Sequence, residues 1–341
     1  MSDGVRGVGA TGDAHDGTRT VLEAAMFEMK RVIVGQDGML ERVLVALLAG
    51  GHLLIEGVPG LAKTLTVRTL AEVLGGNFKR IQFTPDLVPS DLIGTRIYKA
   101  DTGTFDTELG PVLCNFLLAD EINRAPAKVQ SALLEIMQEK QVTIGSETYA
   151  VAEPFLVMAT QNPIEAEGTY PLPEAQLDRF MMKVVVDYPS FGEEMSVVER
   201  SLHDPPRIQQ ILTSAELLAF QHNIDSVYVD RLVREYAVAL TMATRAPARY
   251  HVGDLEPYIA YGASPRGSIN LIHSARALAL LRGRNYVLPG DVRALAKDVL
   301  RHRLVLSYEA LAETVRSDEI LDAIVAAIPM PAIELAQEQS A

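Results

Sequence analysis

Between positions 57 and 64 the chain reads Gly57-Val58-Pro59-Gly60-Leu61-Ala62-Lys63-Thr64. A short apolar run at 52–56 precedes this stretch and predicts a buried strand, while residues 65–74 carry apolar side chains at helical spacing. A strand, a glycine loop and a helix in this order are the context in which such a motif binds phosphate. The stretch therefore predicts a phosphate-binding loop; an ordinary glycine turn between strand and helix is the alternative.

The loop's composition suits a nucleotide and its metal ion. Glycines let backbone N–H groups turn around an anion, and the following helix adds its positive N-terminal end. We expect Lys63 to reach the β- and γ-phosphates and Thr64 to place its hydroxyl on Mg²⁺. Ala62 departs from the general pattern, which has glycine there, and leaves room for a phosphate if its φ angle is negative. The predicted nucleotide-binding residues of this stretch are Gly57, Val58, Pro59, Gly60, Leu61, Ala62, Lys63, Thr64 and Leu65.

Two acids end a second apolar run, at 112–121. The run predicts a buried strand, and its carboxylates then emerge at the carboxyl edge of a sheet, where open α/β sheets bind ligands. We expect Asp120 to hold Mg²⁺ beside Thr64, so these two are the predicted metal ligands. Glu121 faces elsewhere and is predicted to orient and deprotonate an attacking water. Two solvated acids at a strand end are the alternative.

Three further residues are candidates for the same chemistry. Asn162 follows a buried strand at 155–160, where an amide can hold both the γ-phosphate and the water; an Asx-turn before Pro163 is the alternative. Arg179 is a candidate for reaching a neighbouring subunit's ATP; the alternative is a surface arginine that pairs with a nearby acid. Arg266 begins a helix and requires a counter-charge there, either a phosphate or a core acid.

Two more positions leave their alternatives open. Val34 lies between two predicted helices, 20–31 with Thr20 as N-cap and 37–49, and either covers an adenine ring or packs an elbow on the core. Arg124 faces a neighbouring nucleotide or pairs with a local acid.

Composition bounds the class of protein. Hydrophobic residues make up 48% and charged residues 22% of the 341 positions, which is typical of a globular protein. No apolar run approaches the ~20 residues that cross a bilayer, and the N-terminus lacks a secretory h-region. The single cysteine, Cys114, is expected to be an inert core residue and fits a reducing cytoplasm. A net charge of −13 argues against nucleic acid as the main partner.

Along the chain, we expect a disordered tail at 1–18, an α/β nucleotide-binding domain at 19–203, a helical lid at 204–332 and a tail at 333–341. The connection 84–111 predicts an inserted hairpin, and 141–151 predicts another. After a proline-rich linker at 204–206, helical spacing dominates and strand signal is sparse.

Five motifs in this order resemble an AAA+ ATPase, and more narrowly the MoxR family, over roughly residues 20–330. The family's loop also carries alanine before its lysine. The resemblance implies a five-stranded parallel sheet flanked by helices, followed by an all-α lid. The motifs lie at 56–64, 118–126, 159–163, 171–180 and 262–266.

The resemblance also assigns roles. It implies that Lys63 and Thr64 form the Walker A pair, Asp120 and Glu121 the Walker B pair, Asn162 sensor 1, Arg179 the arginine finger and Arg266 sensor 2. It further implies ATP and Mg²⁺ as cofactors, a homo-oligomeric ring that is usually a hexamer, a protein client, and a partner with a von Willebrand factor A domain.

The leading hypothesis is a Mg²⁺-dependent ring ATPase that remodels or matures a protein client. The alternatives are a magnesium-chelatase-like metal-insertion subunit, a nucleic-acid motor and a non-hydrolysing nucleotide switch. The motor is disfavoured because 84–111 offers only Arg96 and Lys99 as basic groups, and the switch because both acids of the second motif are present.

Overall fold

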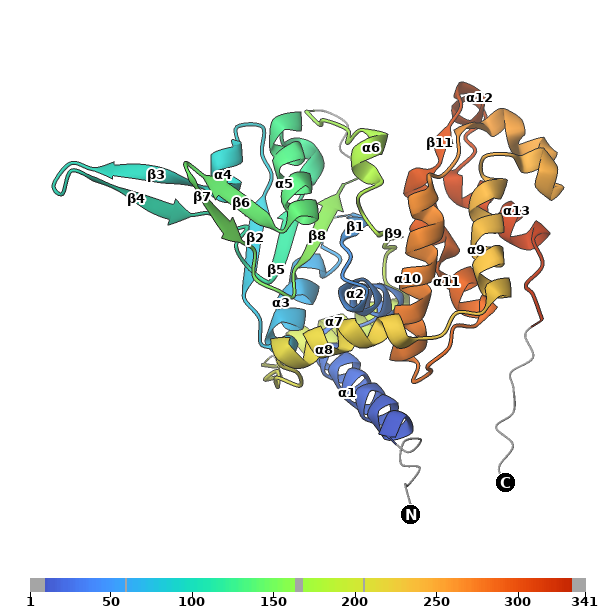
Figure 1. Ribbon diagram of the computed structural model, residues 1–341, viewed down its shortest axis with the longest axis horizontal. Coiled ribbons are helices and arrows are strands. Elements are labelled where there is room, and N and C mark those ends of the chain that lie inside the picture. The colour runs from blue at the N-terminus through green and yellow to red at the C-terminus, as the bar shows by residue number, and fades with distance from the viewer. Residues whose placement is uncertain (1–9, 59, 163–167, 205, 333–341) are drawn as a thin grey trace, which may run out of the picture. The chain divides into compact units, whose positions relative to one another are not determined.

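The computed structural model of the protein describes residues 10–58, 60–162, 168–204 and 206–332. The chain divides into two units, with the boundary between Asn223 and Ile224. The first unit contains a five-stranded parallel sheet, and the second is mainly helical (Figure 1). The predicted α/β architecture followed by a helical region is thereby confirmed.

The sheet of the first unit has the strand order β2-β5-β8-β1-β9, and every neighbouring pair is parallel. Its register sets Gln82 beside Asp120 and Glu56 beside Gln161, so strand ends meet level at one edge. Parallel sheets bind their ligands outside this carboxyl edge. The strands are β1 (Leu53–Glu56), β2 (Phe78–Gln82), β5 (Phe116–Asp120), β8 (Leu156–Gln161) and β9 (Met182–Val185).

Helices cover this sheet and supply its core. The α3 helix packs against β2 and β5. Leu133 and Leu134 of α5 share a buried cluster with Leu117 and Ala119 of β5. The helices of the first unit are α1 (Ala10–Val32), α2 (Asp37–Leu48), α3 (Lys63–Leu74), α4 (Pro89–Ile93), the 3₁₀ turn η1 (Ile122–Arg124), α5 (Ala127–Glu139), α6 (Glu174–Leu177), α7 (Phe191–Ser201) and α8 (Ser214–Asn223).

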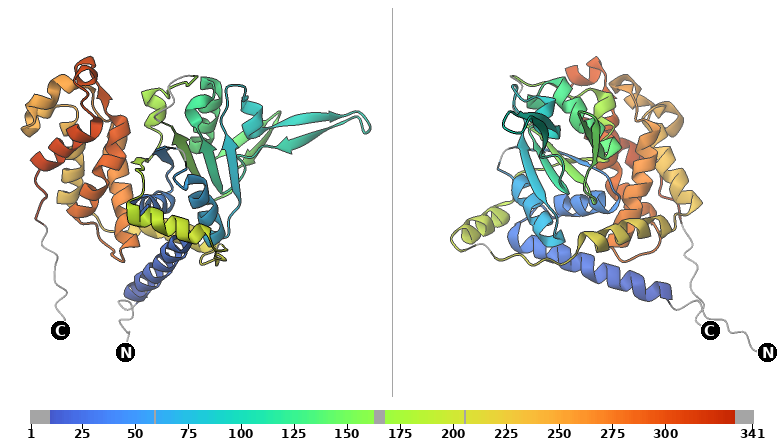
Figure 2. Two further views of the ribbon diagram at one scale, coloured as in Figure 1. Left: turned by 180° about the vertical axis from the view of Figure 1, so that it is seen from behind. Right: turned by 60° about the vertical axis from the view of Figure 1, so that its left-hand side comes forward.

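Both expected hairpins are present. The first consists of antiparallel β3 (Gly94–Lys99) and β4 (Thr104–Leu109) and extends away from the sheet (Figures 1 and 2). The second consists of β6 (Gln141–Ile144) and β7 (Glu147–Ala150).

The second unit is built around three helices that contact one another, α9, α10 and α11. Asp291, at the start of α11, is 1% exposed and accepts hydrogen bonds from Arg284 at 2.7 Å and from Arg282 at 3.1 Å. The elements of the unit are η2 (Ile224–Ser226), α9 (Arg231–Ala243), η3 (Pro247–Tyr250), η4 (Gly253–Tyr258), β10 (Ile259–Tyr261), α10 (Pro265–Leu281), α11 (Pro289–Leu300), η5 (Arg301–Arg303), β11 (Val305–Leu306), α12 (Tyr308–Ala312) and α13 (Ser317–Ala327).

The first helix is longer than the sequence predicts. It begins at Ala10, so Thr20 lies inside it rather than capping it, and residues 10–18 are not the expected tail. Leu22, Ala25 and Met29 are buried and anchor the helix, and extending a helix that is already formed costs little per residue. The predicted tails at 1–9 and 333–341 lie outside the described residues.

The boundary between the two units also differs from the expected one at 203/204. Residues after the linker return to the first unit, because Ile211 donates its N–H to the Val73 carbonyl at 2.8 Å. The α8 helix follows, and Gln221 donates to the Leu47 carbonyl at 2.6 Å. These bonds place the boundary after α8.

Cys114 is 1% exposed, and burial raises the pKa of its thiol to about 12, as expected for an inert core residue. None of the helices within the described ranges is long and apolar enough to cross a membrane.

Candidate nucleotide-binding site

The glycine loop connects β1 to α3 at the carboxyl edge of the sheet. Gly57 has no room for a side chain, because a Cβ there would lie 2.8 Å from the Val186 carbonyl oxygen. Gly60 adopts φ 88°, a conformation that glycine adopts without strain. Ala62 adopts φ 54°, so the negative φ angle that was the condition for its leaving room for a phosphate is not met. The turn into α3 requires a left-handed residue at this position, and the chain places alanine there at a cost of ~1 kcal/mol. Pro59 lies outside the described residues.

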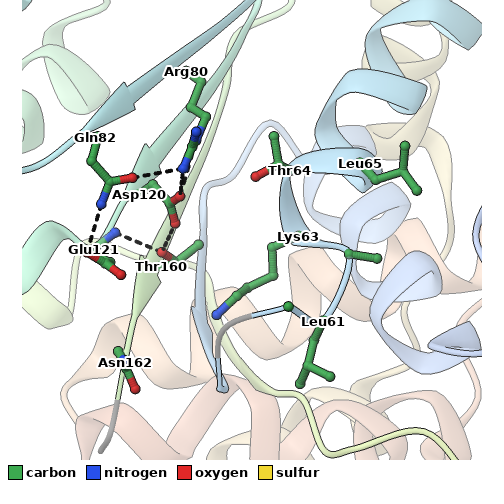
Figure 3. A pocket seen from close by; sticks show the side chains of 12 residues that line it. Leu61, Lys63, Thr64, Leu65, Arg80, Gln82, Asp120, Glu121, Thr160 and Asn162 are labelled. Atoms are coloured by element: carbon green, nitrogen blue, oxygen red, sulfur yellow. Dashed lines mark hydrogen bonds and ion pairs between the residues drawn. The ribbon is translucent and has the colours of Figure 1, made fainter. Parts of the chain in front are cut away.

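Lys63 is the first residue of α3, and its ammonium donates to the Gly57 carbonyl at 2.6 Å. Burial lowers the pKa of this lysine, and the nearby carboxylates of Asp120 and Glu121 oppose that shift. Figure 3 shows the Lys63 side chain pointing from the loop toward the carboxyl ends of the strands. The lysine is thus held beside the loop that a phosphate would enter.

Asp120 ends β5 and is held by two neighbouring strands. Its Oδ1 accepts a hydrogen bond from the Thr160 hydroxyl of β8 at 2.6 Å. Its Oδ2 accepts from the guanidinium of Arg80 on β2 at 2.7 and 3.2 Å. The carboxylate is therefore held in position by protein groups alone.

Glu121 leaves the strand and adopts φ 56°, although the sequence predicts that the strand continues through it. The strand is also shorter at its start, where residues 112–115 form turns instead. In this turn Glu121 donates its backbone N–H to the Thr160 hydroxyl at 2.8 Å. Its Oε2 accepts from Gln82 of β2 at 2.7 Å and pairs with Arg124 at 3.3 Å. A left-handed residue other than glycine is strained, and such strain clusters at functional sites.

These groups surround one cavity of about 420 Å³, which is within the range of small-ligand sites. Residues 60–65 form one wall, and the opposite wall carries Arg80, Gln82, Asp120, Glu121, Thr160 and Asn162 (Figure 3). Asn162 directly follows β8 and is 7% exposed. The cavity thus places a lysine and a hydroxyl opposite two carboxylates and an amide.

The donor set fits Mg²⁺. Thr64 and Asp120 line the same cavity and offer a hydroxyl and a carboxylate, both hard oxygen ligands. Within the described ranges no three His, Cys, Asp or Glu side chains converge into an all-protein metal cage. Mg²⁺ does not need one, because it usually takes one or two carboxylates together with substrate phosphates and waters.

Some predicted site residues lie elsewhere. Arg124 pairs with Glu121, a local acid. Val34 and Val58 are partly exposed and, like Arg179, do not line the cavity described above. Arg179 lies between α6 and β9. Arg266 is the second residue of α10 in the second unit, where its N–H donates to the Ser264 side chain at 3.2 Å.

Three residues of the cavity escape sequence reasoning: Arg80, Gln82 and Thr160. Arg80 and Gln82 are two positions apart on β2 and therefore share one face of the strand. This alternation around buried Ile81 was the available signal. Thr160 gives no local signal, since a threonine at a strand end is common.

This combination of features defines an AAA+ ATPase. It consists of a parallel sheet of this strand order, a phosphate loop after β1, paired acids at the end of β5 and a helical lid. Residues 52–182 match the ATPase family associated with various cellular activities, and residues 254–324 match the AAA lid domain.

Known proteins narrow this class. The chaperone MoxR1 of Mycobacterium tuberculosis is 55% identical, with 93% of this chain and 84% of that protein covered. The protein MoxR of Paracoccus denitrificans is 36% identical, with 88% and 94% covered. The crystal structure of a candidate ATPase from Cytophaga hutchinsonii superimposes with a TM-score of 0.88 at 48% identity, covering 94% of this chain and 98% of that one. The chain belongs to the MoxR family of AAA+ ATPases.

Proposed function

We propose that the protein is a ring-forming, Mg²⁺-dependent ATPase that couples ATP hydrolysis to remodelling or maturation of a protein client. The observation that carries this proposal is the arrangement of one cavity, in which Lys63 and Thr64 lie opposite Asp120 and Glu121. This set supplies phosphate binding, metal binding and a general base within one space.

Each side chain has a role that its surroundings support. Lys63 binds the β- and γ-phosphates of ATP, while Thr64 and Asp120 would hold the Mg²⁺. When bound, the metal ion neutralises charge on the phosphate oxygens. Glu121 orients the attacking water and accepts its proton, and Asn162 donates a hydrogen bond toward the γ-phosphate. Catalysis on this scheme depends mainly on positioning and charge.

The ring is proposed from Arg179. Its place outside the lining of the cavity supports a role in a neighbouring subunit's site, where a forked guanidinium would stabilise the transferring phosphoryl group. We propose a hexamer, as the family resemblance implies. Arg266 is proposed as a second arginine on the nucleotide, and Val34 as part of the adenine contact.

The client is proposed to be a protein because of the β3–β4 hairpin. Tyr98 and Phe105 are 57% and 59% exposed, and their rings pack 5.3 Å apart. Exposed aromatic surface of this kind marks interaction sites. Lys99, one of the hairpin's two basic residues, pairs with Asp106 at 2.6 Å, which reduces its availability for nucleic acid.

The resemblance further supports a partner with a von Willebrand factor A domain, and the single buried cysteine supports a cytoplasmic location. The 55% sequence identity to a protein named as a chaperone favours client remodelling over the metal-insertion alternative.

The test uses Glu121→Gln, which removes the base and keeps the shape. We expect this variant to bind ATP, to hydrolyse it at least 100-fold more slowly, and to retain a larger assembly in sedimentation with ATP. Client proteins should then be captured on Glu121→Gln with ATP. The matched control is Lys63→Ala, which should bind neither nucleotide nor client. Normal turnover by Glu121→Gln would overturn the assignment of the site.

A further inference from the structure

The guanidinium of Arg80 is hydrogen-bonded to the carboxylate of Asp120, the group proposed to bind the metal ion. Its Nη2 and Nε both donate to Oδ2 of Asp120, at 2.7 and 3.2 Å. Thr160 takes the other oxygen, Oδ1, at 2.6 Å. Both oxygens of Asp120 are therefore engaged by protein groups, and Figure 3 shows Arg80 on the side of the cavity opposite Lys63.

The two partners differ in exposure. The side chain of Asp120 is 16% exposed, whereas that of Arg80 is 47% exposed. Arg80 can therefore swing into solvent, where water hydrates its charge, while Asp120 stays in the cavity wall. The ion pair can therefore be broken by movement of Arg80 at the rim of the cavity, without movement of Asp120.

Gln82 steers this arginine and connects it to the second acid. Its Oε1 accepts from Nη2 of Arg80 at 2.9 Å, and its Nε2 donates to Glu121 at 2.7 Å. A side-chain amide presents its oxygen on one side and its NH₂ on the other, so engagement with Arg80 fixes the end that faces Glu121. Arg80, Gln82 and the two acids thus form one continuous hydrogen-bonded row along the sheet edge.

We propose that Arg80 is a positioning residue that acts as a tethered competitor of Mg²⁺ at Asp120, so that the metal ion must displace this guanidinium to bind the carboxylate. The inference rests on the proposed ATP-binding function and names a residue that regulates the same site. Since Mg²⁺ carries twice the charge of a guanidinium, it wins the carboxylate when phosphate oxygens complete its ligand shell.

The experiment measures binding rather than turnover. A fluorescent, non-hydrolysable ATP analogue is held at a fixed concentration while free Mg²⁺ is raised from excess EDTA, and the Mg²⁺ concentration at half-maximal binding is determined. We expect Arg80→Gln to lower this midpoint about three- to fivefold, which corresponds to the ~0.6–1 kcal/mol of a partly exposed pair. In EDTA alone, Arg80→Gln should bind the analogue no more tightly than the wild type, because it has lost a positive charge near the phosphates.

Arg68→Gln is the matched control. It removes the same charge from a pair with Glu72 on α3 that is exposed and outside the cavity, so its midpoint should equal that of the wild type. An unchanged midpoint in Arg80→Gln would overturn the inference, as would tighter binding of Arg80→Gln both with and without Mg²⁺, which would indicate a more open cavity instead. If the wild type fails to bind the analogue at any Mg²⁺ concentration, the proposed function fails, and this inference with it.

Discussion

The Thr160 hydroxyl donates a hydrogen bond to the carboxylate of Asp120 at 2.6 Å. The same hydroxyl accepts one at 2.8 Å from the backbone N–H of Glu121, the residue that follows Asp120. Thr160 is 1% exposed, so water cannot replace either bond readily. One hydroxyl on β8 therefore sets the geometry of both acids that end β5.

Replacing Thr160 with valine tests this arrangement, because valine keeps the shape and removes the hydroxyl. We expect the free energy of unfolding to fall by about 1–3 kcal/mol, since a buried N–H and a carboxylate oxygen each lose a partner. ATP turnover should fall roughly tenfold or more, because both acids lose their alignment. Urea unfolding and a phosphate-release assay measure the two effects. Thr160→Ser keeps the hydroxyl and should retain most of both; equal losses in the serine and valine variants would contradict this role.

Ala62→Gly should relieve the left-handed strain in the loop. Glycine adopts φ 54° freely, and we expect the free energy of unfolding to rise by about 0.5–1 kcal/mol after allowing for the greater freedom of glycine in the unfolded chain. Ala71→Gly, inside the α3 helix that follows this loop, is the control and should lower the free energy of unfolding by about 1 kcal/mol. Urea unfolding followed by circular dichroism distinguishes the two signs, and a destabilised Ala62→Gly would argue against strain at this position.

Arg179→Ala and Lys63→Ala should complement each other if Arg179 acts across a subunit interface. Each variant alone should lose nearly all turnover. In an equal mixture about one interface in four pairs an intact Lys63 with an intact Arg179, so up to roughly a quarter of wild-type turnover should return. Turnover is measured after the subunits have exchanged. No recovery, in a mixture shown to contain mixed assemblies, would argue that Arg179 does not act in a neighbour's site.

His52 should make stability depend on pH. It is buried at the start of β1, where its Nδ1 accepts from the Val157 N–H and its Nε2 lies 3.1 Å from the Met137 carbonyl. Burial lowers its pKa from 6.5 to about 4. The unfolded chain therefore takes up this proton at a higher pH than the folded chain, and stability falls as the pH decreases from 6.5 toward 4.

Between pH 7 and pH 5 this histidine should remove about 2 kcal/mol from the free energy of unfolding. Urea unfolding at the two pH values measures the loss. His52→Gln has no proton to gain in this range, so its loss should be smaller by the same amount. An identical pH dependence in both proteins would show that other groups are responsible.

The sequence predicts the sheet well because parallel, buried strands are continuous apolar runs. The runs at 52–56 and 155–160 predict β1 and β8 to within a residue at each end. The run that contains β5 is predicted four residues too long at its start, because residues 112–115 are apolar enough to continue the pattern and yet lie in turns. Val112, in these turns, donates its N–H to the Leu92 carbonyl of α4. Apolar character reports burial, and burial is common to strands and buried turns.

The backbone conformation of the site was harder to predict from the sequence. Nothing in the residue types of Ala62 or Glu121 indicates a positive φ angle, since neither residue favours it. Both adopt it because the neighbouring elements dictate where the chain must turn. The α7 helix was a different omission: Ser190 and Glu193 form a capping box at its start, a local signal that was present in the sequence.

The cavity residues contributed by β2 depend on tertiary register. Gln82 lies beside Asp120 because β2 and β5 are parallel neighbours, although 38 positions separate the two residues along the chain. Strand order is not visible in a single sequence, so neither Arg80 nor Gln82 could be assigned to the acids of another strand. The motif residues of one continuous loop, by contrast, could be placed directly.

The bond between Lys63 and the Gly57 carbonyl has a consequence for the entropy of ligand binding. The Lys63 side chain is already ordered beside its own loop. A triphosphate that binds there replaces the Gly57 carbonyl with a charged phosphate oxygen as the acceptor, and the ammonium group does not have to be immobilised first. Little conformational entropy is then lost on docking.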